Sequence, residues 1–419
     1  MFKKYSSSIE QYEEDIEFCK NLNNSESDGN MDLISNDLLN FNSQCFIKAQ
    51  YEENVLKKRS ALNTAQEKTN LWINWCLDDK EHNRIDLNNL KQVLDIIQFM
   101  SCILFIEFDS CDHPIDNQML VFKYDKKNYK INLDLDSTQD VKGIYSLNIE
   151  KKCSESKGCI LRKILLFLGL TLTSRRADRD NFIKVIEKNI DPNYSNYFNI
   201  NNNSDKSDTS YDFGSVMQVS NKLWGTANAK TFRTVPKNYE LMAGQEYGLS
   251  FTDIKLLNKR YCENSCIDND KAKKIECKNG GILSPYTCEN CICPNMFAND
   301  NFCEKLEPSD PSCPKNLLYA KKKQQKILFK GKQRCNIKIK AIPGKNISVT
   351  IQKAQLSAYN PCFVGLGLEV KYLKDKTSTG LLMCDIASKV NLVSEDETVL
   401  IQYNGLKNKN MAFITYKSS

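Results

Sequence analysis

The sequence predicts an α+β domain, followed by a small disulfide-rich module and an all-β sandwich. Cysteines are sparse in residues 60–262, where helix-like and strand-like patterns alternate, whereas residues 263–304 hold six. A span of about 40 residues buries too little apolar surface to fold without such cross-links. Residues 305–419 contain alternating apolar segments that are typical of strands. With an acidic leader at residues 1–59, the chain therefore divides into four parts.

Composition excludes several classes of function. The net charge of +6 on 419 residues is too small to indicate nucleic-acid binding. No apolar run approaches the roughly 18–20 residues that a membrane span needs. The 18 cysteines indicate an oxidising compartment, as in secreted proteins. The only two histidines, His82 and His113, exclude an H-E-x-x-H motif or a three-histidine metal site, and we expect both on the surface.

The leader predicts a propeptide. Its acidic, Asn- and Ser-rich sequence ends in a basic run at Arg59, so we expect maturation cleavage between Arg59 and Ser60. The alternative is a basic patch in a linker. No apolar stretch of about 7–15 residues follows Met1, so a signal peptide is absent from this sequence, and we interpret its start as an incomplete gene model of a secreted protein. The glycosylation sequons at Asn193 and Asn346 are compatible with secretion.

Periodicity places the elements of the second part. We expect a helix, three strands, a buried helix and a polar loop, in that order. The residues are Asn88–Phe99, Cys102–Phe108, Met119–Phe122, Tyr129–Leu135, Ile160–Leu172 and Asn193–Thr209.

One segment points to a known family. Gly169 is followed by Arg176, Asp178, Arg179 and Asp180, which resembles the astacin metallopeptidase pattern H-E-x-x-H-x-x-G-x-x-H-E with its following R-x-D-R-D. The resemblance places Gly169 at the turn that ends the family's zinc helix. The resemblance continues through Lys57–Leu62, Val93–Phe105, Tyr211–Met217, Thr234–Lys237, Gly244–Ser250 and Asp253–Cys262. It implies a two-lobed, metzincin-like protease domain, with Met217 beneath the metal and Cys102 bonded to Cys262.

The later cysteines resemble two extracellular modules. Cys277-Lys-Asn-Gly-Gly and Cys291-Ile-Cys293-Pro are similar to an EGF-like module, and a zinc ribbon is the weaker alternative. The four cysteines of residues 305–419 resemble those of a CUB domain. The implied pairs are Cys266–Cys288, Cys277–Cys291, Cys293–Cys303, Cys313–Cys335 and Cys362–Cys384.

The residues that would carry zinc chemistry are replaced. The family's ligand positions hold Arg162, Leu166 and Leu172, and the position of its catalytic glutamate holds Lys163. Leucine has no lone pair to offer a metal, and two cations would stand where a dication should sit. We therefore expect no zinc cofactor, although the family uses one, and we expect Leu166 and Leu172 to fill the space.

Three further positions agree with this loss. The tyrosine two residues after Met217, a donor to the oxyanion in the family, is Val219 here. The glutamate after the third ligand is Thr173, and the propeptide F-x-G-D survives only as Ser27–Asn30.

Six cysteines remain after these pairs. Cys153 has two candidate partners, Cys159 and Cys111. Cys19 could pair with Cys45 inside the leader, and Cys76 completes the set.

We interpret the chain as a secreted astacin homologue without catalytic activity, a regulatory pseudoprotease that binds extracellular protein or peptide. Its cleft would accept an extended peptide by strand addition, which needs a sheet edge and no metal. One alternative is an EGF–CUB adhesion module that binds matrix. Another is an active zinc metalloendopeptidase acting on extracellular proteins. Residues 313–345 hold eleven Lys or Arg and no acid, which indicates either a patch for anionic matrix polymers or the solvated face of strands.

Overall fold

The structure of the protein, a computed structural model, describes residues 71–78, 84–111, 119–125, 144–202, 209–267, 269, 272–298 and 302–419. Contacts divide the chain after Lys68, and all described residues belong to the second unit, Thr69–Ser419. The leader with Cys19, Cys45, Arg59 and Ser60 lies outside the described residues. So do both histidines and the strand expected at Tyr129–Leu135.

The first lobe is built on a four-stranded sheet of order β2-β1-β3-β4 in which every pair is parallel. Parallel neighbours need a crossover connection, and α3 provides it between β1 and β2. Asp86 caps this helix by accepting a hydrogen bond from the backbone of Asn89. The elements are β1 (Leu71–Asp78), α3 (Leu87–Met100), β2 (Ile103–Glu107), β3 (Met119–Asp125) and β4 (Ile144–Glu150).

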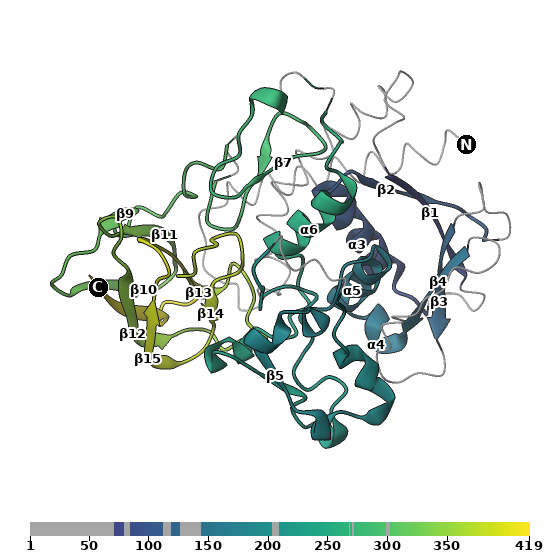
Figure 1. Cartoon of the computed structure of the whole chain (residues 1–419), viewed down its shortest axis with the longest axis horizontal. Helices are drawn as coiled ribbons and strands as arrows, with labels where there is room; N and C mark the ends of the chain where they lie inside the picture. The colour runs from purple at the N-terminus through teal and green to yellow at the C-terminus, as the bar shows by residue number, and fades with distance from the viewer. Residues whose placement is uncertain are drawn as a thin grey trace. The chain divides into compact units, whose positions relative to one another are not determined.

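Two helices pack beside each other on this sheet, α3 and α5 (Lys157–Phe167), and Figure 1 shows them side by side. The short helix α4 (Lys151–Ser154) joins β4 to α5. The helix expected at Ile160–Leu172 is wrong at its carboxyl end, which lies at Phe167. Gly169 adopts φ 79°, and the N–H groups of Gly169 and Leu170 return to the carbonyls of Leu166 and Leu165. This left-handed turn ends the helix, so Leu172 stands outside it.

The second lobe has little regular structure before α6 (Phe251–Tyr261). Two short strands, β5 (Ile183–Val185) and β6 (Phe232–Thr234), pair antiparallel. The polar loop expected at Asn193–Thr209 is partly wrong, because Pro192–Phe198 forms a 3₁₀ helix. Its Tyr197 stacks on Trp224 with ring centroids 4.1 Å apart, which buries this part of the segment.

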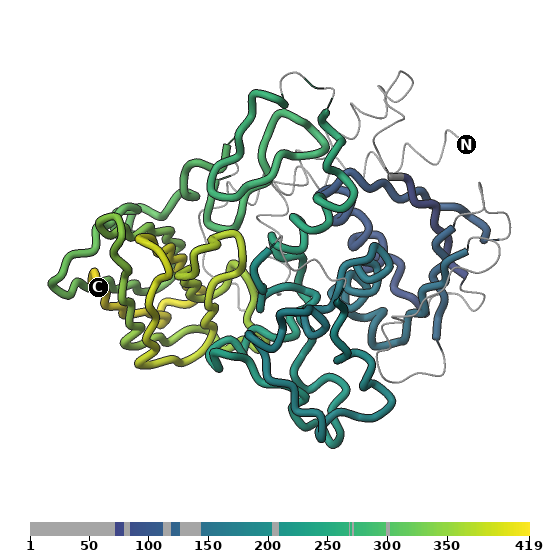
Figure 2. Tube along the Cα trace, in the orientation of Figure 1, coloured from purple at the N-terminus to yellow at the C-terminus, as the bar shows by residue number. Residues whose placement is uncertain are grey.

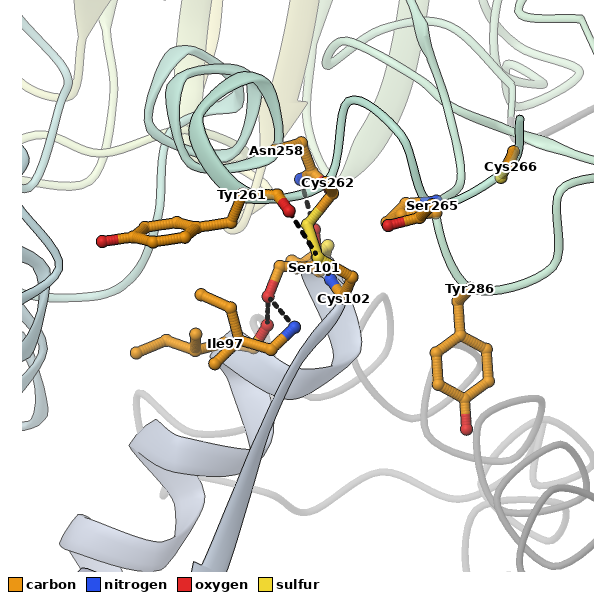
Figure 3. The surroundings of a disulfide bond; sticks show 12 residues. Ile97, Ser101, Cys102, Asn258, Tyr261, Cys262, Ser265, Cys266 and Tyr286 are labelled. Carbon is orange, nitrogen blue, oxygen red and sulfur yellow. Dashed lines mark hydrogen bonds between the residues drawn. A yellow bond between two sulfur atoms is a disulfide. The ribbon is translucent and has the colours of Figure 1, made fainter. Parts of the chain in front are cut away.

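One disulfide ties the two lobes together (Figure 3). Cys102, directly before β2, bonds Cys262 directly after α6, as the resemblance implied. Asn258 of α6 donates to the carbonyl of Met100 at 2.6 Å, and Ser101 caps α3 by donating to the carbonyl of Ile97 at 2.7 Å.

The other cysteines of this domain resolve the open alternatives. Cys153 bonds Cys159, and Cys76 bonds Cys111. The first pair joins α4 to α5, and the second joins β1 to the segment after β2.

The chain then passes through the disulfide-rich module into the sandwich, the green to yellow part of the tube in Figure 2. Among its described residues, the module has one pair of short antiparallel strands, β7 (Ile282–Leu283) with β8 (Cys291–Ile292). Its three disulfides and the two of the sandwich are those implied by the EGF-like and CUB resemblances.

The sandwich consists of two sheets, ordered β10-β17-β12-β15 and β14-β13-β16-β11-β9. Apolar side chains alternate toward the interior between them, as the sequence predicted. No helix of the described residues is long and apolar enough to cross a membrane. The strands are β9 (Leu317–Tyr319), β10 (Gln325–Lys330), β11 (Gln333–Lys340), β12 (Ile347–Gln355), β13 (Gly367–Lys371), β14 (Leu381–Met383), β15 (Ala387–Val393), β16 (Thr398–Gly405) and β17 (Met411–Ser418).

Candidate functional site

Helix α5 carries two of the three positions at which the family binds zinc. Ser156 caps the helix by accepting from the backbone of Cys159, and residues 158–165 are all buried. A helix that is buried on most sides must satisfy its charged residues internally. Arg162 and Lys163 are such residues.

Arg162 is only 1% exposed. Its Nε donates to the carbonyl of Val216 at 2.8 Å, and its Nη1 lies 3.5 Å from Oε1 of Glu246. Burial lowers the pKa of the guanidinium, while the carboxylates of Glu246 and Asp253 raise it. Arginine stays protonated in proteins, so a cation occupies the first ligand position.

Lys163 points to a different set of partners. Its Nζ donates to the carbonyl of Asn148 at 2.5 Å and lies 3.2 Å from the carboxylate of Glu150, at the end of β4. Both side chains of this ion pair are almost fully buried. Lys163 is therefore held against β4, whereas Arg162 binds the loop that contains Val216.

The two leucines also differ from each other. Leu172 is fully buried, whereas Leu166 is only half-buried, and the filling of the metal's space by these two side chains stays a prediction. Met217 is buried, and its carbonyl accepts from the backbone of Thr173 at 3.2 Å, next to the third ligand position. Val219 is buried and apolar.

The residues at these positions do not fit a zinc ion. Two leucines offer no lone pair, and the arginine is a cation that is already hydrogen-bonded. Within the described ranges, no group of three or more His, Cys, Asp or Glu could hold a metal, and His82 and His113 lie outside those ranges.

The loop 211–217 is fixed by Asp253 of α6. Asp253 accepts from the hydroxyl of Ser215 at 2.5 Å and from the backbone of Val216 at 3.1 Å, and it closes a capping box with Ser250. Burial raises the pKa of Asp253 to about 6, against the hydrogen bond from Ser215 and with the help of the Asp212 carboxylate. The same loop therefore presents the carbonyl that Arg162 binds.

A small cavity of about 30 Å³ lies beside this loop, lined in part by Thr173, Met217 and Asp253. That volume holds a water molecule or two and no peptide. Next to it, the hydroxyls of Thr173 and Tyr211 both donate to Oε1 of Gln218, at 2.7 and 2.6 Å. The position of the family's glutamate is thus part of a neutral hydrogen-bond network.

Sequence reasoning did not assign roles to Glu150, Gln218, Glu246 and Asp253. Glu246 and Asp253 lie in segments that match the family pattern, but no spacing rule pairs Glu246 with Arg162. The glycosylation candidates Asn193 and Asn346 are both exposed.

The sandwich also contacts the second lobe. The backbone N–H of Cys362 donates to the carbonyl of Leu241 at 2.8 Å, and the hydroxyls of Tyr239 and Tyr372 are 3.2 Å apart. Tyr247 stacks on Phe363 with ring centroids 3.7 Å apart. On the side of the second lobe, these contacts come from residues 239–247, which lie between the loop 211–217 and α6 in the sequence.

The described fold is a two-lobed domain that is followed by a disulfide-rich region and a β-sandwich, with the cysteine pairs that the EGF-like and CUB resemblances imply. Residues 63–262 match the peptidase family Astacin. Through this domain, the chain is a homologue of the astacin-family zinc metalloproteinases.

Individual relatives agree. Zinc metalloproteinase nas-34 of Caenorhabditis elegans is 29% identical over 253 residues, which cover 60% of this chain and 40% of that protein. Zinc metalloproteinase nas-36 of the same organism is 24% identical over 394 residues, covering 89% of this chain and 61% of the relative. The chain thus spans less than two thirds of the length of these relatives.

Among solved structures, High choriolytic enzyme 1, a hatching enzyme zinc-protease from Oryzias latipes, is similar at 18% identity with a TM-score of 0.40. The match covers 47% of this chain and 92% of that chain.

Proposed function

We propose that this chain is a secreted, catalytically inactive homologue of the astacin proteases that acts by binding extracellular protein or peptide. The observation that carries this proposal is the buried Arg162 at the first ligand position, with its hydrogen bond to Val216 and its ion pair with Glu246. The fold accommodates a buried cation at this position, because the loop at Val216 and the segment at Glu246 both supply partners for it.

Electrostatics oppose a metal at this place. Two unit charges about 4 Å apart interact by about 4 kcal/mol at an effective dielectric constant of ~20, so a dication beside a guanidinium is opposed by about twice that. The general base of the family would also be missing, because Lys163 is a cation held by Glu150. Neither activation of water nor binding of the metal is supported by these residues.

Binding of an extended peptide remains chemically possible without zinc. Strand addition uses backbone N–H and C=O groups at a sheet edge, with pockets for alternate side chains. Within the described residues, the sheet β2-β1-β3-β4 has β2 and β4 as its outer strands, and an added strand would pair with the free edge of one of them. The cysteine pairs and the exposed sequons support an extracellular site of action.

Metal content and peptidase activity test the inactive part of the proposal. The chain, expressed with an added signal peptide and purified folded, should hold well below one zinc per molecule by elemental analysis. It should release no chelator-sensitive fluorescence from quenched peptide substrates. A relative with an intact motif, prepared in parallel, controls for loss of metal during purification. One tightly held zinc together with chelator-sensitive cleavage would establish the active endopeptidase instead.

Backbone methylation tests the binding part. An immobilised library of ten-residue peptides should yield ligands. Each ligand is then N-methylated either at its odd-numbered or at its even-numbered residues, and only one of these two sets of methyl groups should abolish binding. That pattern follows because alternate N–H groups of an added strand face the sheet. Equal loss on both registers, or no loss, would contradict strand addition.

A further inference from the structure

One face of the sandwich presents lysines from three strands. Lys326 and Lys330 of β10, Lys353 of β12 and Lys417 of β17 are all exposed. Their neighbours along the strands, such as Ile327 and Ile414, are buried in the sandwich core. Because side chains alternate between the two faces of a sheet, these lysines share the outer face of β10-β17-β12-β15. We call this surface the lysine face.

The strand register places the lysines close to one another. Lys326 lies opposite Thr415, and Lys417 stands two residues further along β17, which is a diagonal separation of roughly 7–8 Å. Lys353 lies opposite Phe413, which in turn faces Leu328 between Lys326 and Lys330. The four ammonium groups therefore occupy adjacent rows of one sheet surface.

The described strands of this sheet supply no counter-charge to the lysine face. The four strands of the sheet contain no Asp or Glu. Within the described residues, none of the four lysines takes part in an ion pair. Three more exposed lysines, Lys321–Lys323, adjoin the same end, since the N–H of Ser418 donates to the carbonyl of Lys321 at 2.9 Å.

The lysine face is not the basic run that the sequence shows at residues 313–345. The fold sends part of that run to the other sheet, where Lys338 and Lys340 of β11 lie. Arg334 of the same strand is paired with Glu307. Lys353 and Lys417, by contrast, belong to the lysine face although they lie outside residues 313–345. The patch is therefore a product of the strand order and cannot be read from the linear sequence.

The neutral residues of the face indicate the class of ligand. Between the lysines lie hydroxyl and amide groups, with Thr350 donating to Asn391 at 2.8 Å and Gln352 donating to Thr415 at 2.9 Å. Such rows can bond sugar hydroxyls and sulfate oxygens. Leu328, Met411, Phe413 and Val393 interrupt them with apolar surface on three different strands, and Leu328 and Val393 are the two of these that are clearly exposed. Scattered residues of this kind offer little for insertion into a lipid layer.

From these observations we propose that the lysine face binds a sulfated polysaccharide chain. A polyanion would lie along rows of unpaired ammonium groups and release its counterions on binding. This binding is separate from peptide binding by the protease-like domain, so its failure leaves the proposed function standing.

The test uses heparin and the full chain. The variant Lys326→Gln/Lys353→Gln/Lys417→Gln removes three charges from the lysine face. Its matched control, Lys315→Gln/Lys338→Gln/Lys340→Gln, removes three charges from the basic run but none from the face. The face variant should bind heparin at least about tenfold more weakly at physiological salt, and the slope of log Kd against log salt should fall by about two to three. The control should stay close to the wild type. The variant Lys326→Arg/Lys353→Arg/Lys417→Arg should bind as the wild type does, which separates charge loss from misfolding.

Three results would overturn the proposal. An equal loss of heparin affinity in both Gln variants would mean that binding depends only on the total charge of the protein. Unchanged binding to desulfated heparin would exclude sulfate recognition. Tighter binding to phosphatidylserine vesicles than to heparin would assign the face to a membrane.

Discussion

The hydroxyl of Thr379, in the β-sandwich, donates a hydrogen bond to Oδ2 of Asp212, 3.2 Å away in the second lobe of the protease-like domain. Both residues are buried. Gly214 packs against the same threonine, since a Cβ added at Gly214 would come within 2.7 Å of the Thr379 side chain. The loop that presents Val216 to Arg162 is therefore also a surface on which the sandwich rests.

This contact predicts that the two domains unfold together. Phe363 is 7% exposed and stacks on Tyr247, so Phe363→Ala should destabilise the protein by about 3 kcal/mol. Calorimetry of the wild type should show one main transition, and the variant should show it lowered or split. Leu328→Ala, at a side chain that is 45% exposed, is the control and should change little. Two separate transitions in the wild type would show that the contact carries no coupling.

The ion pair of Lys163 and Glu150 predicts that the family's catalytic glutamate is no longer tolerated. Lys163→Glu would place two carboxylates together in a site where both side chains are at most 1% exposed. Breaking a buried pair in this way is expected to destabilise by about 3–5 kcal/mol or more. Urea unfolding and the secreted yield measure the effect.

A double-mutant cycle checks the cause. Lys163→Met alone should leave the Glu150 carboxylate unpaired, whereas Lys163→Met with Glu150→Leu should recover most of the stability. If the double variant were as unstable as Lys163→Met, packing and not charge would explain the loss.

Asp253 predicts a specific pH dependence of stability. Its pKa is raised by burial from 3.8 to about 6, so the folded state binds a proton more tightly than the unfolded state. This term favours folding most below pH 4, and it is lost as the pH rises through 6. The change is on the order of 2–3 kcal/mol.

Asp253→Asn isolates that term. Between pH 4 and pH 7, the wild type should lose about 2–3 kcal/mol more of its unfolding free energy than the variant does, as measured in urea. Asp109→Asn, at an exposed carboxylate, should behave as the wild type. A variant with the same pH profile as the wild type would mean that Asp253 titrates as an ordinary carboxyl.

Local sequence patterns predicted many of the helices and strands. The helical spacing of Asn88–Phe99 predicted α3, because Leu90, Val93 and Ile97 form one buried face. The module disulfides followed from their resemblance to known families. Apolar content misplaced the end of α5, because the sequence after Gly169 stays apolar. The family resemblance implied a helix-ending turn at Gly169, and Gly169 has the left-handed conformation of such a turn.

The sequence predicted which residues stand at the family's ligand positions, but it did not predict which residues they contact. Replacement of the ligand positions is visible in the sequence, yet Glu246 lies 84 residues from Arg162, and only tertiary packing brings them together. The lysine face depends in the same way on the order of β10, β17 and β12. Sequence reasoning also left two partners for Cys153, Cys159 and Cys111, and the structure pairs it with Cys159.

The disulfides differ in how much of the unfolded chain they constrain, and this predicts a ranking. Cys102–Cys262 spans 160 residues, whereas Cys153–Cys159 spans six. In the loop-entropy picture, removing the first should destabilise by about 5 kcal/mol and removing the second by about 2 kcal/mol. Paired Cys→Ser variants measure both in urea, and peptide mapping without reductant identifies the remaining bonds. Because all four cysteines are buried, cavity effects act on both pairs. A larger loss for Cys153→Ser/Cys159→Ser would therefore show that local packing of α4 against α5, and not loop closure, dominates the stability of this domain.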